Sequence, residues 1–389
     1  MATSPLAPTS PKPIGLDILD AEGIYLRDRN NKQYIDLISG IAVNNLGHRH
    51  PSIIQALKDH LDHYLHAMVY GEFVQEKQLA FAKLLTEHLA SSLNNVYFTN
   101  SGSEAVEGAL KLAKKYTRRT EILAFEKAYH GSTHGALSVT GNDALKSGFG
   151  PLLPGVFHGV FNEEVSAELI NHNTAAVIVE VIQGEAGVRN ATPSFLKRLR
   201  ERCTAFGALL IIDESQTAFG RTGHLYAHQS YDVIPDILVL AKALGGGMPL
   251  GAFIASGQVM NVLSHDPALG HITTFGGHPL SCAAGLAHMQ ALISEGWMDT
   301  VAEKEKRFRE NLSHPLIKEI RGSGLMLAVE LGNTALREKA CDQALKNGLL
   351  TDWFLFCDTA LRIAPPLTIT LEQIDQACAI IDKSLNEAE

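Results

Sequence analysis

Cysteine, basic charge and long apolar runs are all scarce in this sequence of 389 residues. The five cysteines are widely spaced and never form a C-x-x-C pair, so neither a disulfide framework nor a cysteine-ligated zinc site is expected. Lysine and arginine number 33 against 42 aspartate and glutamate residues, for a net charge of −9, and there is no long basic run. Binding to nucleic acid is therefore not expected.

The apolar runs are too short for a membrane-spanning chain. They reach about ten residues, whereas a transmembrane helix needs about 20. Residues 1–13 contain no apolar core of signal-peptide type and are expected to form a flexible tail. Because free thiols are typical of a reducing compartment, these features predict a cytoplasmic protein that does not bind membranes. Hydrophobic residues still make up 46% of the chain and charged residues only 19%, enough to bury a large core.

Short apolar runs rich in branched residues alternate with helical patterns through the middle of the chain. Strands are expected at residues 95–99, 122–125, 175–181, 208–212, 237–240 and 252–254. Uniformly apolar strands separated by helices are typical of an α/β fold with a mostly parallel sheet covered by helices on both faces. In such a sheet, ligands bind at the carboxyl ends of the strands.

The two ends of the chain have a different pattern, typical of a smaller α+β domain. The expected elements are a β-hairpin at 23–38, extended chain at 317–331, a helix at 334–346, a strand at 361–370 and a final helix from 371. We therefore expect a large domain with the binding site at residues 51–275. Residues 276–389 would form a connecting helix and the smaller domain, to which residues 1–50 would contribute.

Two charged residues directly follow apolar runs. They are therefore expected at the carboxyl ends of strands, where the ligand-binding crevice lies. Lys242 follows ILVLA and precedes three glycines. A buried amine has a lowered pKa and can attack a carbonyl carbon, although a lysine at a strand end can equally extend to the surface. Asp213 follows ALLII and could pair with a bound cation, or cap the following loop, which is the commoner role. Gln216 could donate a hydrogen bond into the same crevice.

The start of a helix supplies a third signal. In FTNSGSEA, Ser101 and Glu104 fit a capping box. The free backbone N–H groups of Gly102 and Ser103 would also bind a phosphate. No P-loop or G-x-G-x-x-G motif accompanies them, so a nucleotide is disfavoured. An amine, a carboxylate and a phosphate site together match pyridoxal 5′-phosphate, whose aldehyde reacts with a lysine and whose ring nitrogen is kept protonated by an acid.

Six motifs strengthen this interpretation: NSGSEA at 100–105, VIQGEAGV at 181–188, DESQTAFGRTG at 213–223, AKALGGGMPLGA at 241–252, HITTFGGHPL at 271–280 and LRIAPPL at 361–367. With these motifs in this order, the sequence resembles the class III aminotransferases of fold type I over nearly its whole length. Within that family it is most similar to the branch of acetylornithine and ornithine aminotransferases.

The resemblance implies a role for each matching residue. Lys242 would form the Schiff base with the cofactor and shuttle the proton, and Asp213 would pair with the ring nitrogen. Arg362 would bind the substrate α-carboxylate, and Glu185 would pair with Arg362 when a donor reacts through a distal amine. The remaining cofactor contacts would come from Ser101, Gly102 and Ser103 at the phosphate, Tyr129 stacked on the ring, Gln216 at the ring hydroxyl, and Thr274 at the phosphate in the neighbouring subunit. The family further implies a homodimer with shared active sites, and no metal.

The implied reaction is a ping-pong transfer of an amino group from an ω-amino acid or related amine to 2-oxoglutarate or pyruvate. An aminomutase, a decarboxylase or a β-amino acid aminotransferase on the same fold is the alternative. A non-catalytic amine sensor is disfavoured by the complete set of lysine, aspartate and phosphate site.

Two departures from the family bear on the amino donor. Ser132 stands where the ornithine branch usually has an arginine for the donor carboxylate, and the N-terminal Asn-Tyr-x-Pro motif is replaced by SPKP at 10–13. Ornithine and acetylornithine are therefore expected to be poor donors, unless Lys12 or His130 supplies the missing positive charge.

Overall fold

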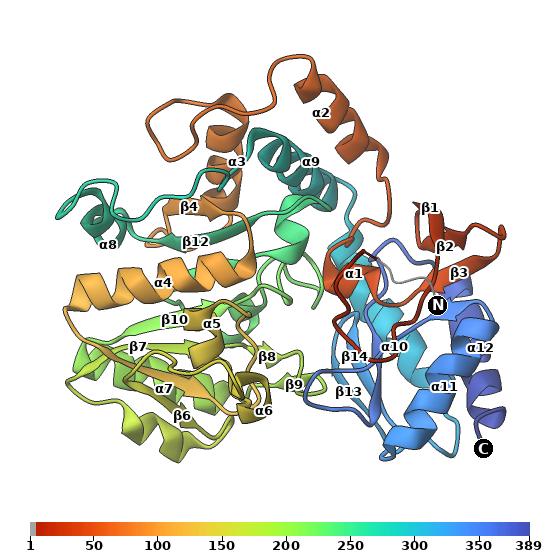
Figure 1. Cartoon of the computed structure of the whole chain (residues 1–389). Coiled ribbons are helices and arrows are strands. Elements are labelled where there is room, and N and C mark those ends of the chain that lie inside the picture. The colour runs from red at the N-terminus through yellow and green to blue at the C-terminus, as the bar shows by residue number, and fades with distance from the viewer. Residues whose placement is uncertain (1–4) are drawn as a thin grey trace.

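The computed structural model describes residues 5–389, so the first four residues of the expected tail lie outside the described residues. The largest sheet has seven strands in the order β4-β12-β11-β10-β7-β5-β6 (Figure 1). Their bounds are Asn95–Thr99 (β4), Gly251–Ala255 (β12), Ile237–Leu240 (β11), Leu209–Asp213 (β10), Thr174–Val179 (β7), Glu121–Phe125 (β5) and Val156–Gly159 (β6). All run in one direction except β12, which is antiparallel to both neighbours. The predicted mostly parallel α/β sheet is confirmed.

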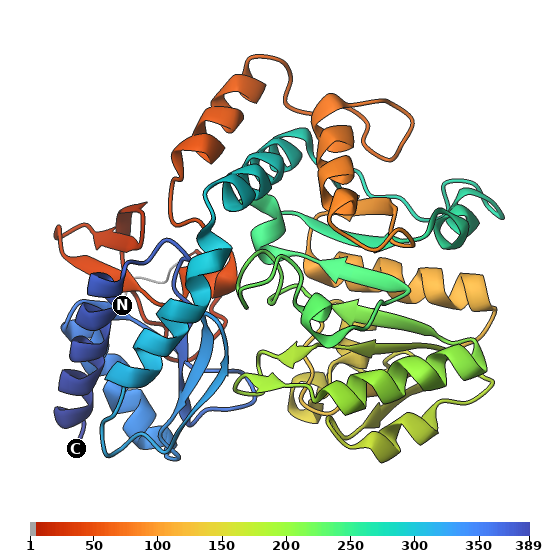
Figure 2. The same ribbon diagram turned by 180° about the vertical axis from the view of Figure 1, so that it is seen from behind.

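Helices cover both faces of this sheet, which explains why its central strands are apolar at every position. Leu210 and Ile212 of β10 pack in the cluster that contains Leu199 of α7 (Pro193–Phe206). The alternate residues of the same strand face α4 (Gly102–Thr117) on the other side. Figure 2, seen from behind, has α7 in front of the sheet. A strand buried on both faces cannot alternate apolar and polar residues, so continuous apolar runs were the correct signal.

Three more helices pack together beyond the β4 edge of the sheet, at the top of Figure 1: α2 (Pro51–Leu61), α3 (Glu76–Glu87) and α9 (Pro279–Ser294). The short helices α5 (His134–Val139), α6 (Asp143–Lys146) and α8 (Gly257–Met260) lie near its two edges. In the part of the chain that the structure describes, no helix has both the length and the apolarity to cross a membrane.

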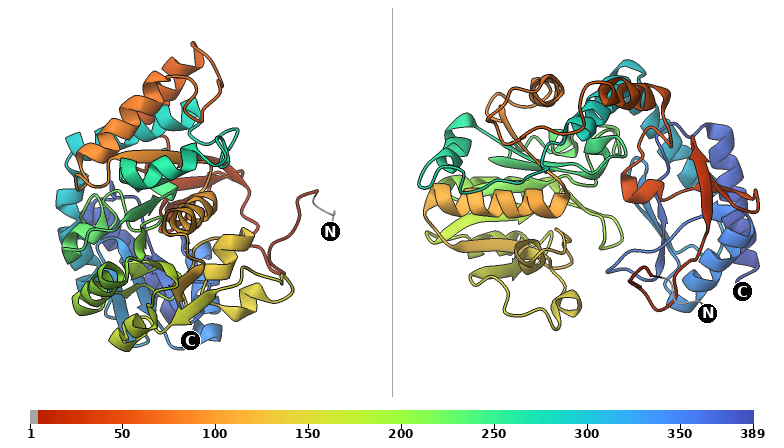
Figure 3. Two further views of the ribbon diagram at one scale, coloured as in Figure 1. Left: turned by 90° about the vertical axis from the view of Figure 1, so that its left-hand side faces the viewer. Right: turned by 45° about the horizontal axis from the view of Figure 1, so that its top comes forward.

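Two smaller sheets draw on both ends of the chain. The first has β1 (Ile18–Glu22), β2 (Tyr25–Asp28), β3 (Gln33–Asp36) and β15 (Leu349–Leu350), and the second has β13 (Glu319–Ser323), β14 (Met326–Glu330) and β16 (Ala360–Ile363). Helices α10 (Val301–Asn311), α11 (Thr334–Lys346) and α12 (Leu371–Asn386) pack beside them (Figure 3). The parallel pairing of β3 with β15 supports our proposal that residues 1–50 belong with 276–389 in a smaller domain, and 51–275 in a large one.

The expected strand at 361–370 is wrong over most of its length. The strand β16 ends at Ile363, and Pro365 and Pro366 follow. Because proline has no N–H to donate to a neighbouring strand, the ladder cannot continue through them. The chain instead runs along the N-terminal segment, where the N–H of Ala364 donates to Leu37 O and that of Leu367 to Asn45 O, both at 2.7 Å.

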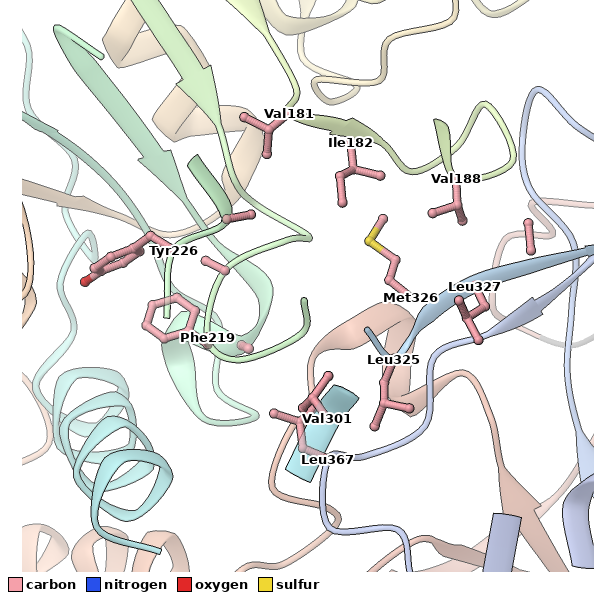
Figure 4. Packing of buried hydrophobic residues seen from close by; sticks show 14 of the residues in the cluster. Val181, Ile182, Val188, Phe219, Tyr226, Val301, Leu325, Met326, Leu327 and Leu367 are labelled. Atoms are coloured by element: carbon pink, nitrogen blue, oxygen red, sulfur yellow. The ribbon is translucent and has the colours of Figure 1, made fainter. Parts of the chain in front are cut away.

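An apolar contact joins strand β14 to a two-stranded sheet that follows β7 in the chain. Figure 4 shows Met326 of β14 beside Ile182 and Val188, which flank the turn between the two short strands β8 (Ile182–Gln183) and β9 (Arg189–Asn190). All three side chains are buried. This contact fixes the β8–β9 turn against β14, whose neighbour is β16.

Helix α4 lies very close to the sheet at Gly108. A Cβ atom on Gly108 would overlap the ring of Phe253 on β12, and both residues are buried. Alanine usually stabilises a helix interior relative to glycine. In Gly108→Ala, helix propensity would therefore raise the stability of the protein, whereas the steric overlap would lower it.

We expect the overlap to dominate, so that Gly108→Ala lowers the stability by about 1–3 kcal/mol. Gly257→Ala in α8 is the matched control, because its Cβ would meet its nearest neighbour at an ordinary 3.6 Å. The measurement is the thermal midpoint of both variants with cofactor bound. A Gly108→Ala protein as stable as the wild type would show that α4 does not need this close approach.

Candidate active site

Three strands of the large sheet end at one edge and bring the predicted site residues together. Asp213 is the last residue of β10, Lys242 follows β11, and the segment Ser101–Ser103 follows β4. These strands are parallel to one another, so their carboxyl ends meet. A cavity of about 420 Å³ lies there, and its walls include Ser101, Gly102, Ser103, Tyr129, Asp213 and Lys242.

Lys242 projects into this cavity from a strained backbone position. Its φ is +48°, in the left-handed region that a side chain with a Cβ rarely adopts, and it opens a short 3₁₀ turn. Among the described residues, none forms a hydrogen bond or ion pair with its amine. Burial lowers the pKa of the Lys242 ammonium, and nearby carboxylates such as Asp213 only partly oppose that effect. The lysine therefore has the properties of a nucleophilic amine.

Asp213 is held by two residues that the sequence analysis did not assign to it. His130 Nδ1 lies 2.8 Å from Asp213 Oδ2, while Ser215 donates to Oδ1 from its N–H at 3.0 Å and its hydroxyl at 2.6 Å. Burial alone would raise the pKa of Asp213, but these contacts outweigh burial and hold the pKa below its usual range. Asp213 is therefore a fixed negative charge at the cavity wall. His130 directly follows Tyr129 in KAYHGST, which is the only local sign of its role.

Glu180 is a further residue near the cavity that the sequence analysis missed. Its carboxylate accepts from Tyr129 N at 3.1 Å and from Gly184 N at 3.4 Å, so it holds the aromatic residue at the cavity. Burial raises the pKa of Glu180 to about 7. One indication of it was present in the sequence: Glu180 is the only acidic residue in the apolar run AAVIVEV, which was expected to form a strand.

The start of α4 leaves backbone donors free for an anion. Ser101 caps the helix by accepting from Glu104 N at 3.2 Å, but the Glu104 carboxylate accepts from Asn100 N rather than closing the expected capping box. No described residue accepts from the N–H groups of Gly102 and Ser103. A Cβ on Gly102 would lie 3.1 Å from Ala241 Cβ, which is a tight contact, so glycine suits this close approach of the two walls. The amides and the helix dipole fit a phosphate group.

Two predicted residues lie away from the main cavity. Gln216 lines a small enclosed space beside it, together with Tyr129, Asp213 and Lys242. Thr274 is exposed and does not line the cavity of its own chain. Its neighbour Thr273 accepts a hydrogen bond from Asn100 at 2.8 Å, so the segment passes close to the start of α4.

Glu185 and Arg362 form a buried ion pair contributed by two different sheets. Glu185 lies in the β8–β9 turn and Arg362 on β16, with both carboxylate oxygens 3.2 Å from the two terminal nitrogens of the guanidinium. Burial alone would raise the pKa of Glu185, but the charge and hydrogen bonds of Arg362 outweigh it and lower the pKa. A planar fork of this kind also matches the carboxylate of a substrate.

Comparisons with known proteins agree over the whole chain. The family described as Aminotransferase class-III matches residues 7–385. An acetylornithine aminotransferase of Caldanaerobacter subterraneus subsp. tengcongensis is 40% identical over 382 residues, covering 95% of this chain and 94% of that protein. One from Aquifex aeolicus is also 40% identical, covering 94% and 95%.

Solved structures give the same result. The ornithine aminotransferase of Toxoplasma gondii, in a structure with partial occupancy of pyridoxal phosphate at its active site, superimposes with a TM-score of 0.90 at 32% identity. The alignment covers 97% of this chain and 91% of that one. The amine, the fixed carboxylate and the free amides fit the same cofactor. The chain therefore belongs to the class III aminotransferases, is pyridoxal-phosphate-dependent, and is similar to the acetylornithine and ornithine aminotransferases.

Proposed function

We propose that this aminotransferase takes an amino group from an ω-amino acid or related amine and transfers it to 2-oxoglutarate or pyruvate by a ping-pong mechanism. The observation that carries the proposal is the Glu185–Arg362 pair. With Glu185 in place the arginine is neutralised and a donor can react through its distal amine. With Glu185 displaced the same guanidinium can bind the carboxylate of a 2-oxo acid. A mutase or decarboxylase has no need for this exchange.

The residues around the cavity fit the roles that the family implies. The N–H groups of Gly102 and Ser103 would bind the cofactor phosphate, with Ser101 beside them. Asp213 would face the ring nitrogen, Tyr129 the ring face and Gln216 the ring hydroxyl. Bound pyridoxal phosphate supplies an electron-withdrawing ring that stabilises negative charge on the substrate carbon. Lys242 Nζ would take the proton from that carbon and return it in the second half-reaction.

The donor end of the site lacks the positive charge that the ornithine branch of the family usually offers to the carboxylate of ornithine or acetylornithine. Ser132 is exposed, and its hydroxyl lies 3.1 Å from the Tyr129 hydroxyl. Because a serine hydroxyl is neutral, this position offers no positive charge. The two residues that could compensate are engaged elsewhere. Lys12 lies 3.3 Å from Asp342 on α11, and the ring of His130 is buried against Asp213.

An apolar surface near Thr274 supports the proposed homodimer. It includes a hollow of about 330 Å³ whose walls contain Phe73, Val74 and Thr273. Phe73 is 54% exposed and Val74 88% exposed. Exposed apolar patches of this kind commonly mark protein interfaces. A second copy covering the patch would bring Thr274 to the cofactor phosphate of its partner. A cytoplasmic location is supported by the five cysteines, all of which are free thiols.

Lys242→Ala should abolish turnover while cofactor still binds through its phosphate and Asp213, because attachment and proton transfer both require the amine. Borohydride treatment of the wild-type holoenzyme should attach the cofactor to Lys242, as read by peptide mass spectrometry. Lys304 is the internal control, since burial lowers its pKa to about 8 yet its amine donates to Leu367 O. Label on Lys304 or any lysine other than Lys242 would contradict the assignment.

Asp213→Asn should keep measurable cofactor binding and lower turnover roughly a hundredfold or more, as expected when a single electrostatic contact at a reacting centre is lost. Asp236→Asn is the control: Asp236 pairs with Arg200 at 2.7 Å at the opposite end of β10 and β11. It should affect stability but not the rate with saturating cofactor. Turnover of Asp213→Asn within a few-fold of wild type would argue against its role.

Ser132→Arg should improve the use of donors that carry a distal carboxylate. A charge-assisted contact is worth about 1.5–3 kcal/mol, or roughly one to two decades in kcat/KM. The measurement is kcat/KM for ornithine, acetylornithine, 4-aminobutyrate and a carboxylate-free diamine, in wild type and variant. The diamine should change little. If the wild type already strongly prefers ornithine or acetylornithine, another residue binds the donor carboxylate.

A further inference from the structure

Arg362 is held on three sides by one short segment that precedes it in the chain. Asp352 Oδ1 accepts from Arg362 Nε at 2.7 Å, and Trp353 O accepts from Nη2 at 2.8 Å. The ring of Phe354 lies 4.4 Å from the guanidinium carbon, in the geometry of a cation–π contact. None of these three contacts involves Glu185.

The two carboxylates on Arg362 come from different segments and bind different nitrogens. The backbone N–H of Arg362 donates to Asp352 O at 3.0 Å, and the Thr351 hydroxyl donates to Arg362 O at 2.7 Å. Asp352 is therefore tied to the same backbone that carries the arginine. Glu185 comes from the β8–β9 turn and binds the two terminal nitrogens at a longer 3.2 Å. Its carboxylate also accepts from Leu355 N at 3.0 Å, and its backbone oxygen accepts from Phe356 N at 2.9 Å.

We propose that Asp352 is the positioning residue that keeps the Arg362 guanidinium in place while Glu185 gives way to the carboxylate of a 2-oxo acid. This rests on the proposed role of Arg362 in binding that carboxylate. Arginine has a long, flexible side chain, and without a second anchor it would follow Glu185 when Glu185 moves. With Asp352 present, the buried guanidinium is paired with a carboxylate throughout the exchange, which avoids the large cost of an unpaired buried charge.

The position of Asp352 matters more than its charge. The negative charge of Asp352 reduces the electrostatic attraction of the guanidinium for Glu185 and for an incoming carboxylate to a similar extent, because both bind the same two nitrogens. The charge therefore has little net effect on which of these two carboxylates Arg362 prefers. What remains is the geometric effect of the bond to Nε, which a neutral amide oxygen partly preserves and an alanine removes.

The two half-reactions separate this role from a general structural one. In the holoenzyme each can be followed in a single turnover by the absorbance of the bound cofactor, with an amine donor first and 2-oxoglutarate second. Asp352→Ala should lower kcat/KM for 2-oxoglutarate by roughly 10- to 100-fold, mainly through KM, as expected for loss of a charge-assisted hydrogen bond. The donor half-reaction should stay within about threefold. Calorimetry with glutarate, which cannot react, should show a matching loss of affinity.

Three further variants make the result decisive. Asp352→Asn keeps the shape and should give a smaller loss, on the order of fivefold and again only with 2-oxoglutarate. Asp358→Asn is the matched control on the same loop, since its carboxylate contacts Thr334 and not the arginine, and it should behave as wild type. Arg362→Ala tests whether the guanidinium is needed for the half-reaction with 2-oxoglutarate.

The outcomes distinguish the proposed role of Arg362 in binding the 2-oxo acid from the proposed role of Asp352 in positioning Arg362. If Arg362→Ala leaves the reaction with 2-oxoglutarate intact, the proposed role of Arg362 fails. If Arg362→Ala impairs that reaction but the Asp352 variants slow both half-reactions equally, the role of Asp352 is overturned while that of Arg362 stands. The role of Asp352 is also overturned if Asp352→Ala and Asp352→Asn both leave kcat/KM and glutarate affinity within about twofold of wild type.

Discussion

The common direction of β4, β10 and β11 is the constraint on which the rest of the site depends. Because these strands end at the same edge of the sheet, the amine of Lys242, the carboxylate of Asp213 and the free amides at the start of α4 share one cavity. β12 lies between β4 and β11 but runs the other way, so it contributes its first residues to that edge rather than its last. Helices on both faces bury the strands and keep this edge fixed.

Charge compensation inside the protein sets the chemical character of each group. Asp213 remains charged because His130 and Ser215 donate to it, and Glu180 has a pKa near 7 because burial is not offset in the same way. Arg362 lies between Asp352 and Glu185, with Asp352 at 2.7 Å from Nε and Glu185 at 3.2 Å from the terminal nitrogens. In the proposed mechanism, Arg362 exchanges one anionic partner for another while its bond to Asp352 keeps the guanidinium in place.

Much of the fold and part of the site followed from the sequence, for identifiable reasons. Lys242 and Asp213 were predicted because each directly follows an apolar run, and the end of a strand is a local property. β6 was missed because its sequence VFHG is short and only partly buried. His130 and Asp352 were missed because their roles depend on partners 83 and ten residues away, which only the folded chain brings into contact. The strand expected at 361–370 failed because two prolines interrupt it.

The most direct test of this account is a crystal structure of the holoenzyme with glutarate bound in place of a 2-oxo acid. The account predicts a glutarate carboxylate on the terminal nitrogens of Arg362, Glu185 displaced from them, and Asp352 still on Nε. It also predicts the cofactor phosphate at the N–H groups of Gly102 and Ser103. Glutarate bound elsewhere, with Glu185 still paired to Arg362, would contradict the claim that one arginine serves both half-reactions.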